Sequence, residues 1–167
     1  TPQGSAVSPV LANLFLHYAF DRWMEREFPQ NPWVRYADDG IVHCRTKEEA
    51  ERILEALTER MLACKLEIHP EKSRVIYCRS DRFNGSYEQE AFDFLGYTFR
   101  RRPAKSKSGR YCNSFAPAAS KSAGQKLGDR IKKIRQDYRL VTLEALAEKM
   151  NPVIRGWHNY FSAFCAS

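Results

Sequence analysis

Hydrophobic residues recur at helical spacing in two long stretches of the first half of the chain. The first stretch follows Ser8-Pro9, a pair typical of a helix start with Ser8 as the N-cap, and predicts a helix to about Phe28. The second follows residues 46–49, Thr-Lys-Glu-Glu, a capping box that predicts a helix to about Lys65. The buried stripe expected on this second helix consists of Ala50, Ile53, Leu54, Leu57, Met61 and Leu62.

Shorter stretches with alternating or aromatic patterns predict strands. Residues 34–37 and 41–44 predict two short strands around a turn formed by Asp38-Asp39-Gly40. Further strands are expected at 66–69, 74–78 and 92–99, with a polar loop at 80–89. The basic stretch 100–117 is predicted to be either a linker or a long hairpin.

The remainder of the chain has a helical pattern. Helices are expected at about 121–137 and 142–150, and Asn151-Pro152 predicts the start of a separate helix that reaches Phe164. Because the pattern changes near residue 100 from mixed strands and helices to helices alone, the sequence predicts an α+β fold with two domains, 1–99 and 100–167.

Charge is distributed unevenly along the 167 residues, which have a formal net charge of +7. Residues 1–99 contain 12 Lys or Arg and 16 Asp or Glu, whereas residues 100–139 contain 13 and 2. A basic block with interspersed aromatic residues favours a nucleic-acid-binding surface, with a solvated face or an anionic membrane surface as alternatives. No stretch approaches the roughly 18 apolar residues of a membrane span, so we expect no membrane insertion.

The cysteine pattern and the start of the chain bear on the compartment. The five cysteines contain no C-x-x-C pair, which argues against a zinc cluster or a disulfide framework and favours reduced cytoplasmic thiols. The four histidines show no metal-ligand spacing. Because the chain shows no secretory leader, we expect a cytoplasmic protein, and because it starts at Thr1 without an initiator Met, we expect a piece of a longer one.

The pair Asp38-Asp39 is the strongest candidate for chemistry. Two adjacent Asp in a hairpin are most often turn residues. However, adjacent carboxylates repel each other unless a cation lies between them, and hard oxygen ligands suit Mg²⁺. Two such ions about 4 Å apart can activate an attacking hydroxyl and stabilise a leaving pyrophosphate. The spacing alone does not separate these two interpretations.

Five ordered segments favour the catalytic interpretation. Their sequences are TPQGSAVSPVLANLFLH at 1–17, YADD at 36–39, LEIHPEKS at 66–73, FDFLGYTF at 92–99 and NPVIRGWHNYF at 151–161. In this order they resemble group II intron reverse transcriptases, also called intron-encoded maturases. The resemblance implies a partial polymerase palm, in which helices pack on an antiparallel sheet, followed by a helical thumb with the maturase-specific region.

The resemblance also implies roles for individual residues. Asp38 and Asp39 would bind two catalytic Mg²⁺ ions, with Mn²⁺ as a possible substitute, and Lys72 would lie near the leaving pyrophosphate. The residues expected beside the template and the incoming nucleotide are Gln3, Gly4, Tyr36 and Ala37, and those of the primer grip are Phe94, Leu95 and Gly96. Lys72 also fits an ordinary exposed lysine, and the 92–99 segment also fits a core strand.

The basic block would grip nucleic acid, mainly through phosphate contacts. The expected RNA-binding residues are Arg100, Arg101, Arg102, Lys105, Lys107, Arg110, Lys121, Lys126, Arg130, Lys132, Lys133 and Arg135. The expected partners are intron RNA, an RNA template–DNA primer duplex and deoxynucleoside triphosphates, while the oligomeric state is left open. Trp157, Tyr160 and Phe161, at helical spacing, fit a packed core better than a base-stacking surface.

The implied function is RNA-directed DNA synthesis with assistance in intron splicing. One alternative is an RNA-binding maturase in which polymerisation is secondary. Another is a different bacterial reverse transcriptase, of the retron or CRISPR-associated type, which the Gly-Trp-His-Asn-Tyr segment at 156–160 makes less favoured. In this family a third carboxylate and the fingers domain precede the segment at Thr1. We therefore expect the chain alone to be inactive.

Overall fold

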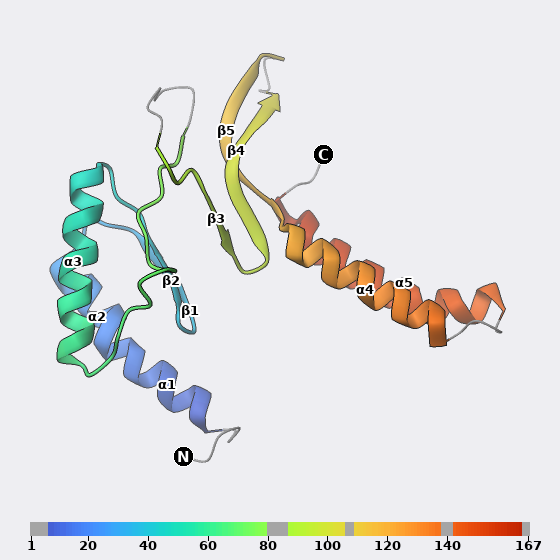
Figure 1. The fold of residues 1–167 in the computed structure, drawn as a ribbon, viewed down its shortest axis with the longest axis horizontal. Helices are drawn as coiled ribbons and strands as arrows, with labels where there is room; N and C mark the ends of the chain where they lie inside the picture. The colour runs from blue at the N-terminus through green and yellow to red at the C-terminus, as the bar shows by residue number, and fades with distance from the viewer. Residues whose placement is uncertain (1–6, 80–86, 106–108, 138–141, 165–167) are drawn as a thin grey trace. The chain divides into compact units, whose positions relative to one another are not determined.

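The computed structural model describes residues 7–79, 87–105, 109–137 and 142–164. The chain divides into two compact units, Thr1–Val75 and Ile76–Ser167, which are described separately below (Figure 1). The structure combines helices with antiparallel strands, so the predicted α+β class is confirmed. Within the described residues, no helix combines the length and the apolar character that crossing a bilayer requires.

The predicted first helix of unit 1 is present, but it contains a change of helix type. It consists of α1 (Ser8–Leu16), a π-helical turn η1 (His17–Asp21) and α2 (Arg22–Glu27). The predicted cap at Ser8 is wrong: Ser8 is already helical, and Val7 occupies the cap position without a side-chain hydrogen bond. Pro9 still lies in the first turn, where its missing N–H leaves no helical bond unmade.

A hairpin follows, and its turn differs from the prediction by one residue. Strands β1 (Trp33–Tyr36) and β2 (Asp39–Val42) pair in antiparallel fashion with Tyr36 opposite Asp39. The turn therefore consists of Ala37 and Asp38, and Gly40 lies within β2 opposite Arg35. The Asp-Asp-Gly segment was expected to form the turn because of its composition, but the observed bend is one residue earlier.

The second predicted helix, α3 (Lys47–Ala63), begins as the capping box predicts. The Thr46 hydroxyl accepts from the Glu49 backbone N–H at 3.1 Å, and the Glu49 carboxylate accepts from the Arg45 backbone N–H at 2.6 Å. The hydrogen bond from the Arg45 backbone N–H, followed by one from the Asn31 side chain, lowers the pKa of the Glu49 carboxyl. The expected stripe is only partly buried, because Leu62 is 61% exposed.

The core of unit 1 lies between α3, the η1–α2 segment and the hairpin. Its buried residues are Phe20, Trp23, Met24 and Met61. Trp33 of β1 meets Phe20 edge to face, with ring centroids 5.3 Å apart, so the hairpin packs on the helical layer. Figure 1 shows α3 beside α2 in this unit.

The two strands predicted at 66–69 and 74–78 are not formed. Leu66 and Ile68 do face the core, and Glu67 between them is exposed, which explains the alternating pattern. The ladder hydrogen bonds of a strand require a neighbouring strand, and among the described residues neither segment is paired in a sheet. The predicted loop at 80–89 lies largely outside the described residues.

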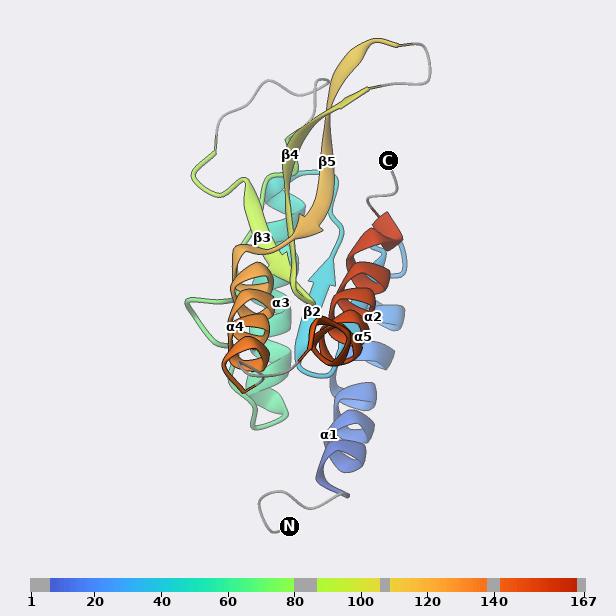
Figure 2. The same ribbon diagram turned by 90° about the vertical axis from the view of Figure 1, so that its right-hand side faces the viewer.

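Unit 2 contains a three-stranded antiparallel sheet in the order β3 (Ala91–Phe94), β4 (Tyr97–Lys105) and β5 (Tyr111–Ala119). The segment predicted as one strand, 92–99, is a hairpin whose two-residue turn is Leu95-Gly96. For 100–117, the long-hairpin alternative is confirmed, since β4 and β5 pair along nine residue positions. Figure 2 shows the two long strands twisting around each other.

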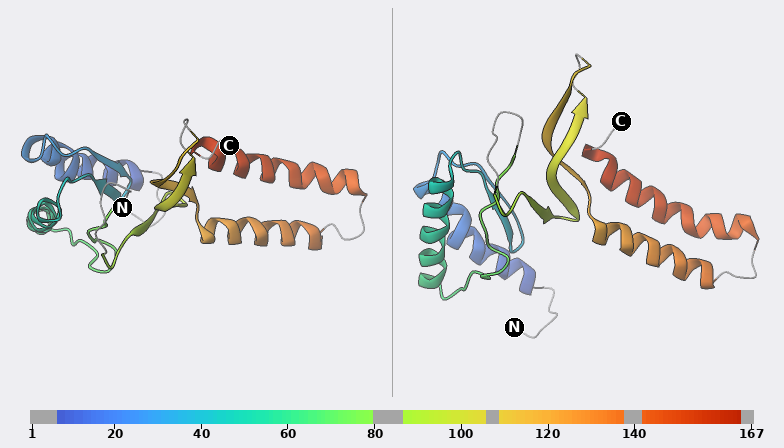
Figure 3. Two further views of the ribbon diagram at one scale, coloured as in Figure 1. Left: turned by 90° about the horizontal axis from the view of Figure 1, so that it is seen from above. Right: turned by 45° about the horizontal axis from the view of Figure 1, so that its top comes forward.

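Two long antiparallel helices, α4 (Lys121–Asp137) and α5 (Leu143–Phe161), follow the sheet, and a short 3₁₀ turn η2 (Ser162–Phe164) ends the described chain. They lie side by side in both views of Figure 3. The predicted break at Asn151-Pro152 is wrong, because Pro152 lies inside α5. The half-buried stripe of Leu146, Met150, Val153 and Trp157 continues across Pro152 at helical spacing. Packing of this stripe offsets the cost of an interior proline.

Candidate functional site

Asp38 and Asp39 lie at the tip of the β1–β2 hairpin, and both are exposed. Asp38 is the second turn residue, and Asp39 is the first residue of β2. Within the part of the chain that the structure describes, neither carboxylate forms an ion pair. Both acids are therefore accessible to a cation, as the catalytic interpretation requires.

The two faces of the hairpin differ in character. Trp33 and Arg35 point toward the helices and are half-buried, whereas Val34 and Tyr36 lie on the opposite face and are exposed. Since residues directly opposite each other in a sheet share a face, Asp39 lies on the exposed face beside Tyr36. This arrangement presents a carboxylate and an aromatic ring together on the free face of the hairpin.

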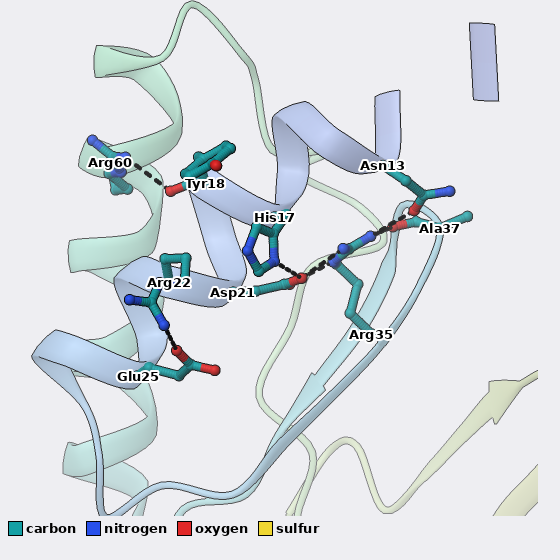
Figure 4. A network of polar contacts seen from close by, with 9 residues as sticks. All are labelled: Asn13, His17, Tyr18, Asp21, Arg22, Glu25, Arg35, Ala37 and Arg60. Carbon is teal, nitrogen blue, oxygen red and sulfur yellow. Dashed lines mark hydrogen bonds and ion pairs between the residues drawn. The ribbon is translucent and has the colours of Figure 1, made fainter. Parts of the chain in front are cut away.

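Arg35 connects the inner face of the hairpin to the first helix (Figure 4). Its Nε donates to Asp21 Oδ1 and its Nη2 to Asp21 Oδ2, each at 2.7 Å, which is a bidentate pair. Its Nη1 donates to the Asn13 side-chain oxygen at 3.0 Å and to the Ala37 backbone carbonyl at 2.7 Å. One guanidinium thus holds α1, η1 and the turn that contains Asp38.

This ion pair is shielded from solvent, since the Arg35 and Asp21 side chains are 12% and 14% exposed. The hydrogen bonds from Arg35 lower the pKa of the Asp21 carboxyl, against the opposing effect of burial. The same bonds raise the pKa of the Arg35 guanidinium. His17, one helical turn before Asp21, places its Nδ1 3.4 Å from Asp21 Oδ2. Asp21 and Arg35 are therefore both charged at neutral pH.

The turn itself has an unusual backbone. Ala37 has a φ of 53°, a left-handed conformation that residues with a Cβ rarely adopt. A positive φ at the first of two turn residues matches a type II′ hairpin turn, in which glycine is the usual choice. Strain of this kind persists only where the surroundings enforce it. The Arg35 bond to the Ala37 carbonyl is a direct constraint on this turn.

The two carboxylates fit Mg²⁺ by ligand chemistry, because this ion prefers hard oxygen ligands and is bound through one or two carboxylates together with water and substrate phosphates. The described residues contain no group of three or more His, Cys, Asp or Glu side chains that could hold a metal. Asp38 and Asp39 therefore fit as part of a magnesium site rather than as a complete set of protein ligands.

The other residues predicted around the nucleotide are only partly described. Tyr36 and Ala37 lie beside Asp38 and are exposed. Lys72 is exposed in a turn in which the Lys72 and Ser73 backbone N–H groups donate to the His69 carbonyl at 3.3 and 3.0 Å. Gln3 and Gly4 lie outside the described residues.

In unit 2, the predicted primer-grip residues form the tip of the β3–β4 hairpin. Leu95 and Gly96 have φ angles of 51° and 80°, the pattern of a type I′ turn. The end of α5 closes on this turn: the Tyr160 hydroxyl donates to the Leu95 carbonyl at 2.8 Å, and a Cβ on Gly96 would lie 3.4 Å from the Phe161 ring. The Tyr97 hydroxyl in turn donates to the Tyr160 backbone carbonyl, and Tyr97 is 4% exposed.

The aromatic residues of α5 are thus packed within unit 2. Trp157 and Phe161 have ring centroids 4.8 Å apart, and Phe161 lies 4.9 Å from the Tyr97 ring. Trp157 and Phe161 are partly buried and pack against other rings, as expected for core residues. Tyr160 is exposed, and its hydroxyl donates to the Leu95 carbonyl.

Most of the predicted RNA-binding side chains are exposed. On the β4–β5 hairpin the exposed ones are Arg100, Arg101, Lys105 and Arg110, and on α4 they are Lys121, Lys126, Arg130, Lys132, Lys133 and Arg135. Arg102 is half-buried and donates from Nε to the Ala116 carbonyl at 3.3 Å, while Lys107 lies outside the described residues. These exposed Lys and Arg side chains supply the positive charge that phosphate binding requires.

Sequence reasoning missed the residues that support these two turns. Asn13, His17 and Asp21 recur every four residues in the otherwise largely apolar stretch 9–21, and this polar line was the available signal. The Tyr160 bond to the Leu95 carbonyl carried no comparable signal, since it joins residues 65 positions apart.

Comparison with protein families gives two matches. Residues 1–99 match the model for reverse transcriptase (RNA-dependent DNA polymerase). Residues 124–167 match the model for the group II intron maturase-specific domain. None of the curated proteins compared with the chain matches it. The first match includes both hairpin tips, and the second includes α5 and most of α4.

Proposed function

The chain belongs to the reverse transcriptase family and carries a group II intron maturase-specific region, and from this premise we propose that Asp38 and Asp39 form part of its nucleotidyl-transfer site. The proposed reaction is attack by a primer 3′-hydroxyl on a deoxynucleoside triphosphate, with release of pyrophosphate. The observation that supports it is the exposed pair of acids at a hairpin tip held by Arg35.

The reverse transcriptase family uses divalent metal ions, and Asp38 and Asp39 are the residues that would hold Mg²⁺ in this chain. When bound, the metal would favour ionisation of the primer hydroxyl and offset the charge on the leaving phosphates. The chain itself contributes orientation. Asp38 and Asp39 are consecutive exposed residues, one in the turn and one at the start of β2, and Tyr36 lies opposite Asp39 in the hairpin.

The second part of the proposal concerns RNA. The maturase-specific match and the exposed bases of α4 and the β4–β5 hairpin support binding of intron RNA and of the template–primer duplex through phosphates. Binding of this kind could assist splicing independently of polymerisation, because the Lys and Arg side chains and the Asp pair lie on different elements.

The substitution Asp38→Asn tests the catalytic part. It should reduce primer extension by at least about 10³-fold, since a neutral amide lacks the negative charge with which a carboxylate binds Mg²⁺. RNA affinity should change less than about twofold, because one exposed charge at a hairpin tip is altered. The assay is single-nucleotide primer extension on an RNA template, made in a polymerase that contains this chain and extends the primer as wild type.

The control for this test is Asp129→Asn, which removes an exposed acid on α4 and changes the net charge by the same amount as Asp38→Asn. It should leave primer extension near the wild-type rate. Extension that survives Asp38→Asn would overturn the catalytic assignment. Splicing that survives Asp38→Asn while extension is lost would support a separate RNA-binding role.

A further inference from the structure

The strongest feature outside the proposed ligands and primer grip is the largely shielded Arg35 guanidinium behind the hairpin tip. We propose that Arg35, held by Asp21 and Asn13, is a positioning residue that fixes the Asp38-Asp39 pair by binding the Ala37 carbonyl. This inference rests on the proposed function, since it concerns the placement of the same two carboxylates. Arg35 itself touches neither acid in the described contacts; it acts through the backbone of the turn.

The direction of each hydrogen bond supports this role. Two of the four bonds go to Asp21 in a bidentate arrangement, which fixes the plane of the guanidinium. The remaining nitrogen, Nη1, then points at both Asn13 and the Ala37 carbonyl. A lysine could satisfy only part of this arrangement, since its ammonium is a single point of charge without a planar fork.

Different interactions hold the body and the tip of the β1–β2 hairpin, so a substitution can change the position of the tip without unfolding the hairpin. Its body is held by packing: the Trp33 ring meets Phe20, and a Cβ on Gly40 would lie 3.7 Å from the Phe20 ring. Its tip has the Arg35 bond to the Ala37 carbonyl, at the residue with φ of 53°. Loss of the guanidinium fork should therefore loosen the tip while the body stays packed.

Asp21 lies at the end of a π-helical turn. In η1 the Arg22 backbone N–H donates to the His17 carbonyl, five residues back, so the segment holds one residue more than an α-helical turn. Phe20 lies in the core, while Asp21, the last residue of the turn, forms the ion pair with Arg35. The turn thus carries a core residue and the partner of Arg35 at consecutive positions.

The test is metal binding at the turn in the full 167-residue chain, with Mn²⁺ as a paramagnetic probe. In the wild type, Mn²⁺ should broaden the backbone amide NMR signals of Asp38 and Asp39 at the lowest concentrations. In Arg35→Lys, the Mn²⁺ concentration for half-broadening should rise by about threefold to tenfold, because the acids are no longer held in one arrangement. Amide hydrogen exchange at residues 38–40 should become faster in the same variant.

Arg22→Lys is the matched control, because Arg22 is an exposed arginine of α2 that pairs with Glu25 at 2.9 Å and lies outside the Arg35 network. It should leave the Mn²⁺ concentration for half-broadening unchanged. A purely structural role for Arg35 would lower the melting temperature but leave that concentration at the wild-type value, which would overturn the inference.

Two further outcomes are distinguishable. If Mn²⁺ broadens no signal at the turn of the wild type, the metal assignment under the proposed function fails, and this inference fails with it. If Arg35→Lys does not fold, Asn13→Ala is the alternative variant. It removes only the hydrogen bond from Arg35 Nη1 to the Asn13 side chain, and it should raise the Mn²⁺ concentration for half-broadening about twofold. An unchanged value in folded Asn13→Ala, together with unchanged hydrogen exchange at residues 38–40, would overturn the inference.

Discussion

At the scale of residues, the candidate site depends on one ion pair that the reaction itself does not use. Asp21 and Arg35 are largely shielded from solvent and form two hydrogen bonds with each other. Removing one partner of such a pair leaves the other charge without compensation, which costs more than the pair contributes in net stability. Substitutions at this pair should therefore affect stability as well as the hairpin tip.

Asp21→Asn should lower the free energy of unfolding by about 1–3 kcal/mol at neutral pH. The folded pKa of Asp21 is lowered, so the contribution of its carboxylate is fully present above the unfolded pKa, near 3.8. That contribution is lost as the pH falls from about 4 through the folded pKa. Urea unfolding at pH 7 and pH 3 measures both values, and the gap between wild type and variant should shrink at the lower pH.

Glu25→Gln is the control for this pH dependence. Glu25 pairs with Arg22 at the surface, where both side chains are more than half exposed. Exposed pairs of this kind contribute about 0–1 kcal/mol. A gap between wild type and Asp21→Asn that stays constant from pH 7 to pH 3 would contradict the assigned role of the Asp21 carboxylate.

At the scale of elements, two hairpin tips in the chain are each held by a side chain from a helix or from the hairpin's inner face. In β1–β2 the Arg35 fork holds the Ala37 carbonyl, and in β3–β4 the Tyr160 hydroxyl holds the Leu95 carbonyl. In both turns a residue other than glycine has a positive φ. The tips thus combine backbone strain with a side-chain hydrogen bond to a turn carbonyl, as expected where a chain segment must stay in one conformation.

Gly96→Ala tests the contact between the β3–β4 tip and α5. It should lower stability by about 1 kcal/mol from the positive φ alone. The new Cβ would lie 3.4 Å from the Phe161 ring, so any loss beyond this value measures how firmly that ring is held against the turn. Gly109→Ala is the matched control, since Gly109 has the same φ of 80° but nothing within 4 Å of a Cβ. Thermal unfolding of both variants measures the difference. Equal losses would mean that Phe161 does not constrain the turn.

The elements that the sequence predicted correctly are those with local chemistry. Thr46 and Glu49 define the start of α3 through bonds within four residues, and the basic helix at 121–137 has the predicted bounds. The strands expected at 66–69 and 74–78 failed because alternation records burial on one side, whereas a strand also requires a partner. The break expected at Pro152 failed because packing along α5 outweighs the local preference.

The candidate site was predictable only in part. Asp38 and Asp39 were identified from the segment 36–39 within its ordered context, and both are exposed at a hairpin tip as expected. The position of the turn was one residue off, because the Arg35 side chain that binds the Ala37 carbonyl is itself held by Asp21, a tertiary contact that turn composition does not reveal. The lysine at 72 and the primer-grip assignment stay predictions.

At the scale of the whole molecule, the boundary between the compact units and the start of the basic block lie at different positions in the sequence. The boundary between the units falls between Val75 and Ile76, whereas the basic block begins at residue 100, within β4. The predicted domain boundary at residues 99 and 100 likewise falls inside β4 and stays a prediction. Arg100 and Lys105 lie on the same long hairpin strand as Tyr97, which α5 contacts.

Removal of charge from α4 should weaken RNA binding and its salt dependence together. Lys126, Arg130 and Lys133 are exposed and lie on one helix face by their spacing. The triple alanine variant should lower the slope of log Kd against log salt concentration by about two to three. Filter binding of a structured intron RNA between 50 and 200 mM KCl measures this slope.

The control removes the same charge from the other unit. Arg22, Arg26 and Lys47 are exposed and each lies within 4 Å of an acid, so they are already compensated. Their triple alanine variant should leave the slope within about half a unit of the wild-type value. An equal drop in both variants would mean that net charge, rather than the α4 face, determines the affinity.

The bond between the Tyr160 hydroxyl and the Leu95 carbonyl has a practical consequence for anyone who dissects this protein. The polymerase match ends at residue 99 and the maturase-specific match begins at residue 124, which invites a cut between them. Such a cut would separate Gly96 from the Phe161 ring and Tyr97 from the end of α5. The two stretches that sequence comparison distinguishes share one set of aromatic contacts, so neither half inherits an intact β3–β4 tip.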